Sequence, residues 1–388
     1  MHIVMLSDVY FPRVNGVSTS IHTFRHDLMR AGYKVTLIAP DYGHPTENEA
    51  DILRVSGWQV PFDPEDRIMH WFGVRGMLNK LRQNKFDVVH IQTPFAAHIF
   101  GVRLARELNV PSVETYHTFF EEYFHHYLPF LPKSWTQSAV RKVARLQCSQ
   151  VDGLISPSHA MLGLLRKYDV ATEAEVIPTG LDSDWFRKGE GRRFREKHGI
   201  APARPTLVHI GRIAFEKNIG FLLDMLVHVR QRIPDVLLIL CGEGPATAQL
   251  KQQVRSMGLA DSVMFAGYLS RAGDLQDCYC AGDAFVFASR TETQGLVLLE
   301  AMAMGVPVVA LAYLGAEEIL RPQRGAVIAP DDPAGFAEHV IALMHDPTRR
   351  ERLSEEARVY AREWGSHVFA EKLVHYYRTI AAAKSRTA

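Results

Sequence analysis

The sequence has few cysteines and no excess of charge of either sign. Its 388 residues include four cysteines, Cys148, Cys241, Cys278 and Cys280, and no Cys-x-x-Cys pair. Cys278 and Cys280 are too close for the usual zinc-ligand spacing, and a disulfide framework is not expected in a chain this long. Lys and Arg number 44 against 43 Asp and Glu, a net charge of +1. This balance argues against a nucleic-acid binder and against an acidic disordered chain.

The amino end and the longest apolar run also lack the features of membrane insertion. Residues 1–8 have no basic region followed by a long apolar stretch, so they do not resemble a signal peptide. We therefore expect a cytoplasmic, reducing compartment. The run from 296 to 316 is apolar except for Glu300, and Gly305 and Pro307 interrupt it. Because a charge at that depth is costly in lipid, we expect a buried helix (about 297–304), a turn and a buried strand instead.

Short apolar segments alternate with helical ones along the chain, which predicts parallel sheets covered by helices on both faces. Strands are expected at 3–7, 35–39, 87–91, 113–116, 153–156 and 175–178, and again at 206–211, 236–241, 262–265, 284–288, 306–311 and 325–328. A turn-rich segment separates the two groups. We predict two doubly wound, Rossmann-like α/β domains, 1–180 and 181–365, with a carboxyl-terminal helix (about 366–388) joining the first. Ligands are expected where the strands end, in a cleft between the domains.

Neither half contains the Gly-x-Gly-x-x-Gly fingerprint or a Walker A sequence, so simple dinucleotide and NTPase functions lose their main support. Polar groups at strand ends remain. Gly16 precedes a predicted helix (about 18–31), where the backbone can approach an anionic ligand closely. An ordinary turn with a helix cap at Asn15 explains the same residues. His117 follows a predicted strand and is either a ligand-facing residue or a core histidine bonded to backbone.

The second half carries two cations and two acids in the same kind of position. Arg212 and Lys217 follow the strand 206–211 and could grip a diphosphate, or form a surface pair. Glu292 lies in a loop, and Glu300 follows eight residues later in an otherwise apolar helix. A buried acid needs a partner, and a ribose diol would serve. Gly295, at the start of that helix, would offer backbone N–H groups to a phosphate.

Taken together, these residues resemble the retaining glycosyltransferases of family 4, which have the GT-B fold. Glu292 and Glu300 match the E-x7-E motif of that family. The loop 15–17, the set 211–217 and the run 300–305 also lie where the family has them, and the match spans nearly the whole chain. The resemblance implies an enzyme that transfers a sugar from a nucleotide-sugar and needs no other cofactor.

The resemblance also implies a role for each matching residue. Arg212 and Lys217 would hold the donor diphosphate, which the backbone at Gly16 approaches. Glu300 would hold the ribose, and Glu292 and His117 would contact the sugar. The rest of the implied donor site comprises Gly242, Tyr268 and Leu269 near the base, and the loop residues Thr293, Gln294, Gly295 and Leu296. His117, Glu292, Arg212 and Lys217 are the implied catalytic set.

The implied chemistry places negative charge on a departing nucleoside diphosphate. Arg212, Lys217 and the helix start at Gly295 can stabilise that charge without a metal. Family members retain the anomeric configuration, often explained by front-face attack with the departing phosphate as base. Asp182-Ser-Asp184 matches a metal-binding Asp-x-Asp pattern, but it lies in the turn between the predicted domains. We therefore expect no metal site.

The acceptor is suggested by the stretch 116–127, which resembles the Y-H-T-x-x-E-x-Y motif of diacylglycerol glucosyltransferases and their lipid-modifying relatives. This resemblance assigns Tyr116, Glu122 and Tyr123 to the acceptor side. Basic and apolar residues follow at helical spacing, with cations at Lys133, Arg141, Lys142 and Arg145. Such a helix can bind an anionic membrane interface, or it is an ordinary amphipathic surface helix. Peripheral association with the inner face of the cytoplasmic membrane is expected.

Three functions remain open at this point. The favoured one moves a hexose from a UDP-sugar such as UDP-glucose to a lipid acceptor such as diacylglycerol. The second uses GDP-mannose, or builds a polysaccharide or a lipid-linked oligosaccharide. The third is a non-catalytic module that binds a nucleotide-sugar.

Overall fold

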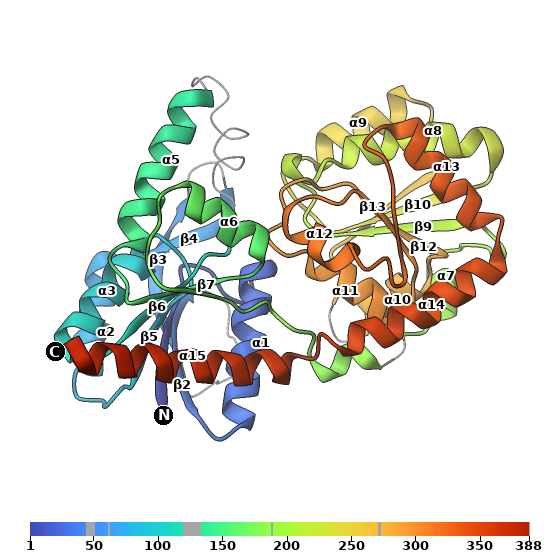
Figure 1. Ribbon diagram of the computed structural model, residues 1–388. Coiled ribbons are helices and arrows are strands. Elements are labelled where there is room, and N and C mark those ends of the chain that lie inside the picture. Colours follow the sequence, from blue (N-terminus) through green and yellow to red (C-terminus); the bar gives the residue numbers. More distant parts are fainter. Residues whose placement is uncertain (44–50, 61–62, 119–132, 188, 271–272, 388) are drawn as a thin grey trace. The chain divides into compact units, whose positions relative to one another are not determined.

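The chain folds into two compact units in the computed structural model (Figure 1), which describes residues 1–43, 51–60, 63–118, 133–187, 189–270 and 273–387. The first unit comprises Met1–Gly180 and Ser366–Ala388, and the second comprises Leu181–Gly365. In each unit helices alternate with the strands of a mainly parallel sheet. The predicted α/β class, with two Rossmann-like domains, is confirmed.

In the first unit the described residues form a sheet with the strand order β4-β3-β2-β1-β5-β6-β7-β8. The strands are β1 (His2–Leu6), β2 (Lys34–Asp41), β3 (Ile52–Val60), β4 (Asp63–Met69), β5 (Val88–Ile91), β6 (Ser112–Thr115), β7 (Gly153–Ser156) and β8 (Ala174–Val176). Only β3 and β4 pair antiparallel within this sheet. Neither strand was predicted from the sequence. β4 begins Asp-Pro-Glu-Asp, and strands are poor in proline and acidic residues.

Helices cover both faces of this first sheet. They are α1 (Gly16–Arg30), α2 (Trp71–Leu81), α3 (Ala96–Leu108), α5 (Lys133–Cys148), α6 (His159–Lys167) and α15 (Ser366–Thr387). On one face α2, α3, α5 and α6 share a core with Val89 and Ile91 of β5. His90 lies between these two residues and therefore points to the other face, where the ring bonds Tyr377 of α15. The carboxyl-terminal helix is thus part of the first unit's core.

The described residues of the second unit form a parallel sheet with the order β11-β10-β9-β12-β13-β14. The strands are β9 (Thr206–Ile210), β10 (Leu237–Cys241), β11 (Val263–Gly267), β12 (Ala284–Phe287), β13 (Val308–Ala310) and β14 (Ala326–Ile328). The helices are α7 (Gly191–Lys197), α8 (Ile219–Arg232), α9 (Thr247–Ser256), α10 (Asp274–Cys280), α11 (Leu296–Ala303), α12 (Leu314–Leu320), α13 (Pro333–Met344) and α14 (Pro347–Arg362). Short 3-10 turns lie at Ser183–Phe186 (η1) and Phe215–Lys217 (η2).

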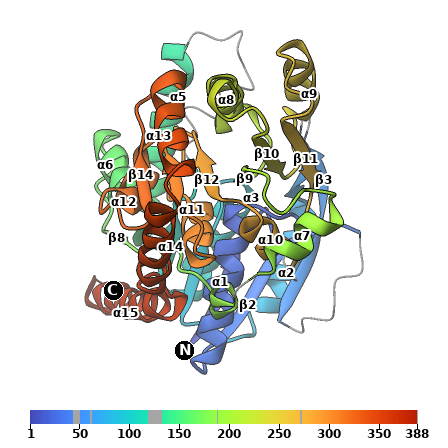
Figure 2. The ribbon, with the colours of Figure 1, turned by 90° about the vertical axis from the view of Figure 1, so that its right-hand side faces the viewer.

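Two apolar clusters sandwich this second sheet. One contains residues of α7, α10, α11, α12 and α14. The other is built mainly by α8, α9 and α13, of which α8 and α13 contact each other (Figure 2). Val208 belongs to the first cluster and Leu207 to the second, because neighbouring side chains of a strand point to opposite faces. The run 296–316 forms α11, β13 and the start of α12, and no described helix is long and apolar enough to span a membrane.

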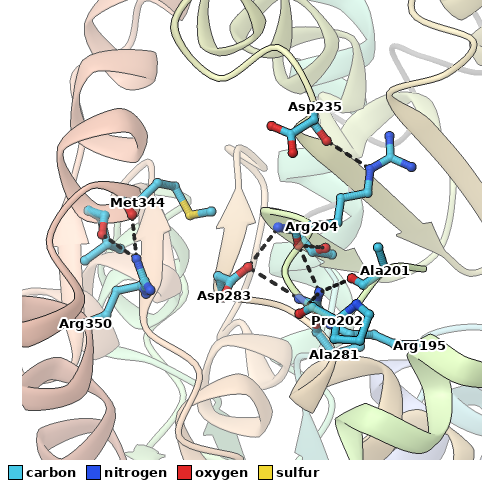
Figure 3. A network of polar contacts seen from close by, with 11 residues as sticks. Arg195, Ala201, Pro202, Arg204, Asp235, Ala281, Asp283, Met344 and Arg350 are labelled. Carbon is cyan, nitrogen blue, oxygen red and sulfur yellow. Dashed lines mark hydrogen bonds and ion pairs between the residues drawn. The ribbon is translucent and has the colours of Figure 1, made fainter.

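Two arginines bind backbone carbonyls at the amino edge of the second sheet (Figure 3). Arg195 donates to four backbone carbonyls at 2.9 to 3.1 Å, those of Ala201, Pro202, Arg204 and Ala281. Arg204 donates to the carbonyls of Asp235 and Asp261, which precede β10 and β11. Asp283, before β12, accepts from the backbone N–H of Thr206 at 2.8 Å. The starts of four neighbouring strands are therefore tied together through backbone groups.

Candidate active site

The loops after β9, β10 and β11 form one connected surface at the carboxyl edge of the second sheet. The Gly211 N–H donates to the Cys241 carbonyl at 3.0 Å, and the Gly242 N–H donates to the Gly267 carbonyl at 2.8 Å. Gly242 has φ +130°, and a Cβ there would lie 2.0 Å from the Gly211 oxygen. Position 242 therefore requires glycine, both for its backbone conformation and for the close approach of the two loops.

Lys217 and Glu292 meet at this edge. Lys217 Nζ donates to Glu292 Oε1 at 2.5 Å, and the two side chains are 23% and 15% exposed. Burial alone would raise the pKa of Glu292, but the charge and hydrogen bond of Lys217 outweigh it, so the pKa lies below its ordinary value. Glu292 is therefore ionised at neutral pH and held by a cation from the loop after β9.

His209 lies in β9 beneath this ion pair. Its Nδ1 is 3.1 Å from the Val286 carbonyl and donates to it, so Nε2 carries the lone pair. Burial lowers the pKa of His209 to about 4, the Val286 bond opposes this, and the charge of Lys217 lowers the pKa further. Within the part of the chain that the structure describes, Nε2 of His209 and Oε2 of Glu216 are buried without a hydrogen-bond partner. Most buried polar atoms are hydrogen-bonded, so these two retain the capacity to accept a hydrogen bond from a ligand or a water.

Arg212 lies beside Glu216, with Nη1 and Oε1 4.0 Å apart. The two side chains are 17% and 13% exposed, so both are largely withdrawn from water. The loop residue Thr291 reaches the same segment, because its hydroxyl lies 3.4 Å from the Glu216 carbonyl. The structure thus brings Arg212, Lys217 and Glu292 to one edge of the sheet.

Glu300 lies in α11 and is 2% exposed, as its apolar neighbours predicted. Its Oε2 accepts a hydrogen bond from the Tyr279 hydroxyl at 2.8 Å. Tyr279 gave no signal in the sequence, because it lies in the seven-residue helix α10, which is too short to show a helical period. The structure therefore supplies a protein partner for the acid, in addition to any ligand.

The loop that carries Glu292 is held against α12. The Gly315 N–H donates to the Glu292 carbonyl at 3.0 Å, and a Cβ at Gly315 would lie 2.0 Å from the Thr293 oxygen. Gln294 is buried, and Gly295 has φ +96° where α11 begins at Leu296. Tyr268 is 56% exposed, and Leu269 packs on the core of the unit. All the donor residues predicted in the second half thus lie at this carboxyl edge.

Gly16 and His117 belong to the first unit. Gly16 is the first residue of α1, slightly earlier than predicted, because Asn15 Oδ1 accepts the Ser18 N–H at 2.8 Å and caps the helix. The cap is therefore present, yet nothing lies within 4 Å of the place that a Cβ of Gly16 would occupy. Neither packing nor a positive φ requires glycine here, so this position leaves space for a ligand.

His117 is half-buried, and its Nε2 is 2.8 Å from Oε1 of the Gln92 side chain. Burial lowers the pKa of His117 to about 4, so the ring is neutral at pH 7. This hydrogen bond joins His117 to a side chain of the first unit. Gln92 follows β5, and its place beside His117 gave no signal in the sequence.

The structure describes some of the predicted acceptor residues. Tyr116 is 6% exposed in the core of the first unit, Glu122 and Tyr123 lie outside the described residues, and Lys133 begins α5. Arg141 lies over the Tyr168 ring at 5.5 Å, and Arg145 is 3.9 Å from Asp169. Lys142 is exposed, with Val143 52% and Leu146 50% exposed on the same helix.

The Asp-x-Asp pattern has a local structural role. Asp182 Oδ1 accepts from the Asp184 N–H at 3.2 Å and caps η1. Among the described residues no group of three or more His, Cys, Asp or Glu side chains is arranged to hold a metal ion.

Two Rossmann-like units, with cations and acids gathered where the second sheet ends, define a glycosyltransferase of the GT-B fold. Residues 14–185 match the family model "Glycosyltransferase Family 4", and residues 191–360 match "Glycosyl transferases group 1". The alpha-monoglucosyldiacylglycerol synthase of Streptococcus pneumoniae is 35% identical over 324 residues, which cover 80% of this chain and 71% of that protein. The chain belongs to the family 4 glycosyltransferases and is an enzyme of that class.

Other similar proteins extend the match to the whole chain. The enzyme of the same name from Acholeplasma laidlawii is 26% identical over 97% of this chain and 96% of its own. A GDP-mannose-dependent alpha-mannosyltransferase from Mycobacterium tuberculosis is 26% identical over 100% and 99%. Among solved structures, sucrose-phosphate synthase from Thermosynechococcus elongatus has a TM-score of 0.80 at 20% identity, over 99% and 100% of the two chains. Anabaena HepE in complex with UDP-glucose has a TM-score of 0.74 at 18% identity, with full coverage of both. These structures establish the fold alone.

Proposed function

We propose that the enzyme transfers a hexose from a UDP-sugar, with UDP-glucose favoured, to a lipid acceptor such as diacylglycerol, with retention of configuration. The observation that carries this proposal is the 35% identity to a monoglucosyldiacylglycerol synthase, which covers most of both chains. The partly buried Lys217–Glu292 pair at the carboxyl edge supports an active donor site.

The donor is held by the residues gathered at the second sheet. Arg212 and Lys217 bind the diphosphate, and the N–H groups at Gly295 are available to the same phosphates. Glu300 accepts hydrogen bonds from the ribose hydroxyls, and Tyr279 fixes the carboxylate that does so. Glu292 and His117 contact the sugar, and the exposed ring of Tyr268 lies where the base can pack.

The chemical step breaks the bond between the anomeric carbon and the diphosphate oxygen. The acceptor hydroxyl forms the new bond on the same face, and the departing phosphate oxygen takes the acceptor's proton. Lys217 stabilises the charge that grows on this oxygen, because its ammonium group is preorganised beside Glu292. Positive charge thus comes from the chain itself, and we expect EDTA to leave the transfer rate within about twofold.

The lipid acceptor implies contact with a membrane surface, and the first unit offers a suitable face. Val143, Leu146 and Lys142 are exposed on α5. Phe95 and Ile99, at the start of α3, are 46% and 51% exposed. The Gln147 side chain donates to the Pro94 carbonyl at 2.6 Å, which holds the start of α3 beside the end of α5. We include in the proposal that this mixed apolar and basic face binds anionic lipid at the membrane periphery.

The decisive experiment measures transfer of labelled sugar from UDP-glucose, UDP-galactose, UDP-glucuronate and GDP-mannose, each alone, to liposomes containing diacylglycerol. Labelled glycolipid from one UDP-sugar is expected, and the anomeric configuration of the product tests retention. Labelled lipid from GDP-mannose alone would overturn the donor assignment. Hydrolysis of a donor without lipid labelling would overturn the acceptor assignment.

The membrane contact is tested by cosedimentation with liposomes containing anionic lipid. Lys142→Glu together with Val143→Ser should reduce the pelleted fraction, while Lys372→Glu, an exposed lysine of α15, makes the same charge change as a control. Arg141 and Arg145 are less suitable, since both contact residues of the fold. Equal pelleting of the parent and the double variant would contradict the assignment of this face.

The alternative donor is GDP-mannose, with a polysaccharide, lipid or lipid-linked oligosaccharide as acceptor. It is supported by the identity to a GDP-mannose-dependent mannosyltransferase along the full chain. The four-donor assay separates the two proposals directly.

A further inference from the structure

A cluster of three side chains joins three loops at the carboxyl edge of the second sheet. Nη2 of Arg290 donates to Oδ1 of Asp331 at 2.5 Å, and the Tyr313 hydroxyl donates to Oδ2 at 2.7 Å. The Arg290 guanidinium also lies over the Tyr313 ring, 6.0 Å from its centroid. Each residue of this Asp331 cluster therefore contacts the other two. Arg290 follows β12, Tyr313 follows β13 and Asp331 follows β14.

Two of these loops meet a second time, at Glu292. Arg290 precedes Glu292 by two residues, and Tyr313 precedes Gly315 by two residues. The Gly315 N–H donates to the Glu292 carbonyl at 3.0 Å. The loops approach so closely there that position 315 has no room for a Cβ. Asp331 thus binds the same two segments whose contact places the backbone of Glu292.

The residue between Tyr313 and Gly315 has an unusual backbone conformation. Leu314 has φ +48°, in the left-handed region that leucine rarely adopts. Such a conformation persists only where the surrounding contacts hold it. The hydrogen bond of the Tyr313 hydroxyl lies on one side of this residue, and that of the Gly315 N–H lies on the other. Loss of the first bond should therefore weaken the second.

The backbone around Asp331 is fixed by regular structure. The Ala329 N–H donates to the Ala310 carbonyl at 3.0 Å, which continues the pairing of β13 with β14. The next residue, Asp332, caps α13 by accepting the Gly335 N–H at 2.7 Å. Asp331 therefore lies between a sheet and a helix, and it can serve as a fixed point for the two loops that it binds.

The cluster keeps its charges at neutral pH. Burial would raise the pKa of Asp331, but the hydrogen bonds from Arg290 and Tyr313 outweigh it, so the pKa lies below its ordinary value. The hydrogen bond to Asp331 raises the pKa of Tyr313, which therefore remains a donor. Asp331 accepts both hydrogen bonds as a carboxylate.

We propose that Asp331, Arg290 and Tyr313 are positioning residues that hold Glu292 in place for its contact with the transferred sugar. They do so by fixing the loop 288–295 against the start of α12. Lys217 holds the carboxylate of Glu292, and the Asp331 cluster holds its backbone. This inference rests on the proposed contact between Glu292 and the sugar, and it adds which residues fix that contact.

The first test reads the loop directly and needs no substrate. Asp331→Ala removes both acceptors of the cluster, so hydrogen exchange of the Gly315 amide should become roughly fivefold faster or more. Glu363→Ala is the matched control. Glu363 accepts from Arg324 at 2.7 Å, and Arg324 lies over the Tyr360 ring, 4.9 Å from its centroid.

This control cluster lies at the amino end of β14, whereas the Asp331 cluster lies at its carboxyl end. Glu363→Ala should therefore leave the exchange of the Gly315 amide unchanged. Unchanged exchange in Asp331→Ala, or equal acceleration in the two variants, would overturn the proposal.

The second test separates kcat from the donor KM. Asp331→Ala should lower kcat about 5- to 20-fold and leave the donor KM within about twofold, because Glu292 is displaced from the reacting sugar while the cations that bind the diphosphate remain. Tyr313→Phe removes one hydrogen bond and keeps the ring, so a smaller loss of kcat is expected. Equal kcat losses in Asp331→Ala and Glu363→Ala would indicate a general effect on the unit and contradict the proposal.

The third test asks whether the effect passes through Glu292. If it does, Asp331→Ala should have little further effect on kcat in a Glu292→Ala background. Full additivity would contradict the proposal. If no donor and acceptor pair supports transfer, the proposed function fails, and the exchange of the Gly315 amide still decides whether Asp331 fixes the loop that carries Glu292.

Discussion

The two edges of the second sheet use polar groups in opposite ways. At the amino edge, Arg195 and Arg204 donate to the backbone carbonyls that precede four strands (Figure 3). At the carboxyl edge, Nε2 of His209 and Oε2 of Glu216 are buried without a partner among the described residues. The same sheet thus has one edge that is internally satisfied and one that is not.

This difference separates stability from function. A satisfied guanidinium stabilises the fold, because removing it takes a hydrogen bond from each carbonyl that it binds. Unsatisfied acceptors, and a partly buried carboxylate held by one lysine and a serine hydroxyl, cost folding free energy that a ligand can offset. Substitutions at the two edges should therefore change different measured quantities.

The largest effect is expected from Lys217→Ala at the carboxyl edge. It removes the cation beside the departing diphosphate and leaves Glu292 buried without its partner. We expect kcat to fall about 100- to 1,000-fold and the donor KM to rise, because the lost interaction strengthens as charge develops. Steady-state kinetics with the preferred donor measure both. Arg212→Ala should change both constants in the same directions.

The pH dependence of Lys217→Ala provides a check on the cause. Without Lys217, burial dominates, and the pKa of Glu292 should rise above its ordinary value. The acid limb of the rate profile should therefore move to higher pH in the variant. Unchanged kcat, KM and pH profile would show that the carboxyl edge is not the donor site.

Arg195→Ala tests the amino edge, with an expected loss of about 3 kcal/mol of unfolding free energy. Four carbonyls lose a donor, although the Ala201 carbonyl keeps the Arg204 N–H and the Arg204 carbonyl keeps the Thr206 hydroxyl. Asp283 loses a guanidinium 3.4 Å away. At a temperature where the variant remains folded, its kcat and KM should match those of the parent within about twofold. Denaturant unfolding and kinetics on the same preparation measure the two quantities. A large kcat loss with unchanged stability would contradict the assignment of the amino edge to stability.

The sequence predicted the carboxyl edge better than the contacts that support it. Arg212, Lys217, Glu292 and Glu300 follow apolar strands or interrupt an apolar helix, and such local patterns are visible in sequence. Tyr279 and Gln92 reach the site residues only through tertiary packing, so spacing gave no sign of them. The helix α12 and the strand β4 were missed for a related reason, since short or polar elements owe their form to their neighbours.

Asp8 extends the comparison to the first sheet, where it follows β1. Its Oδ2 accepts from the Thr93 hydroxyl at 2.8 Å and the Ala97 N–H at 3.0 Å, while Oδ1 is buried without a partner in the described chain. Burial raises the pKa of Asp8 from 3.8 to about 6, against these hydrogen bonds. The folded state therefore binds this proton more tightly than the unfolded chain does.

The contribution of Asp8 to stability should fall as the pH rises from the ordinary pKa of this carboxyl to its raised pKa. Above pH 6 the contribution should stay low. Between pH 5 and 7.5 the parent should lose about 1 to 2 kcal/mol relative to Asp8→Asn, which has no charge to bury. Thermal unfolding of both proteins across this range measures the difference. Asp41→Asn, at an exposed position, is the control. Parallel pH curves for parent and Asp8→Asn would contradict the raised pKa.

Tyr279→Phe should give the smallest effect. Tyr279 belongs to the supporting core, but its hydroxyl contacts a residue of the site. The ring remains packed against Trp185 and Phe285, so the fold should persist, while Glu300 loses the donor at 2.8 Å. A carboxylate held by one hydrogen bond fewer binds a ribose diol less well, so we expect the donor KM to rise about fivefold, roughly 1 kcal/mol, with little change in kcat. Tyr360→Phe is the control, because Tyr360 lies in the same apolar cluster on α14 and its hydroxyl bonds Trp364. If both variants raise the donor KM equally, the effect comes from packing in the cluster. A rise in Tyr279→Phe alone would show that a contact invisible in the sequence tunes the carboxyl edge.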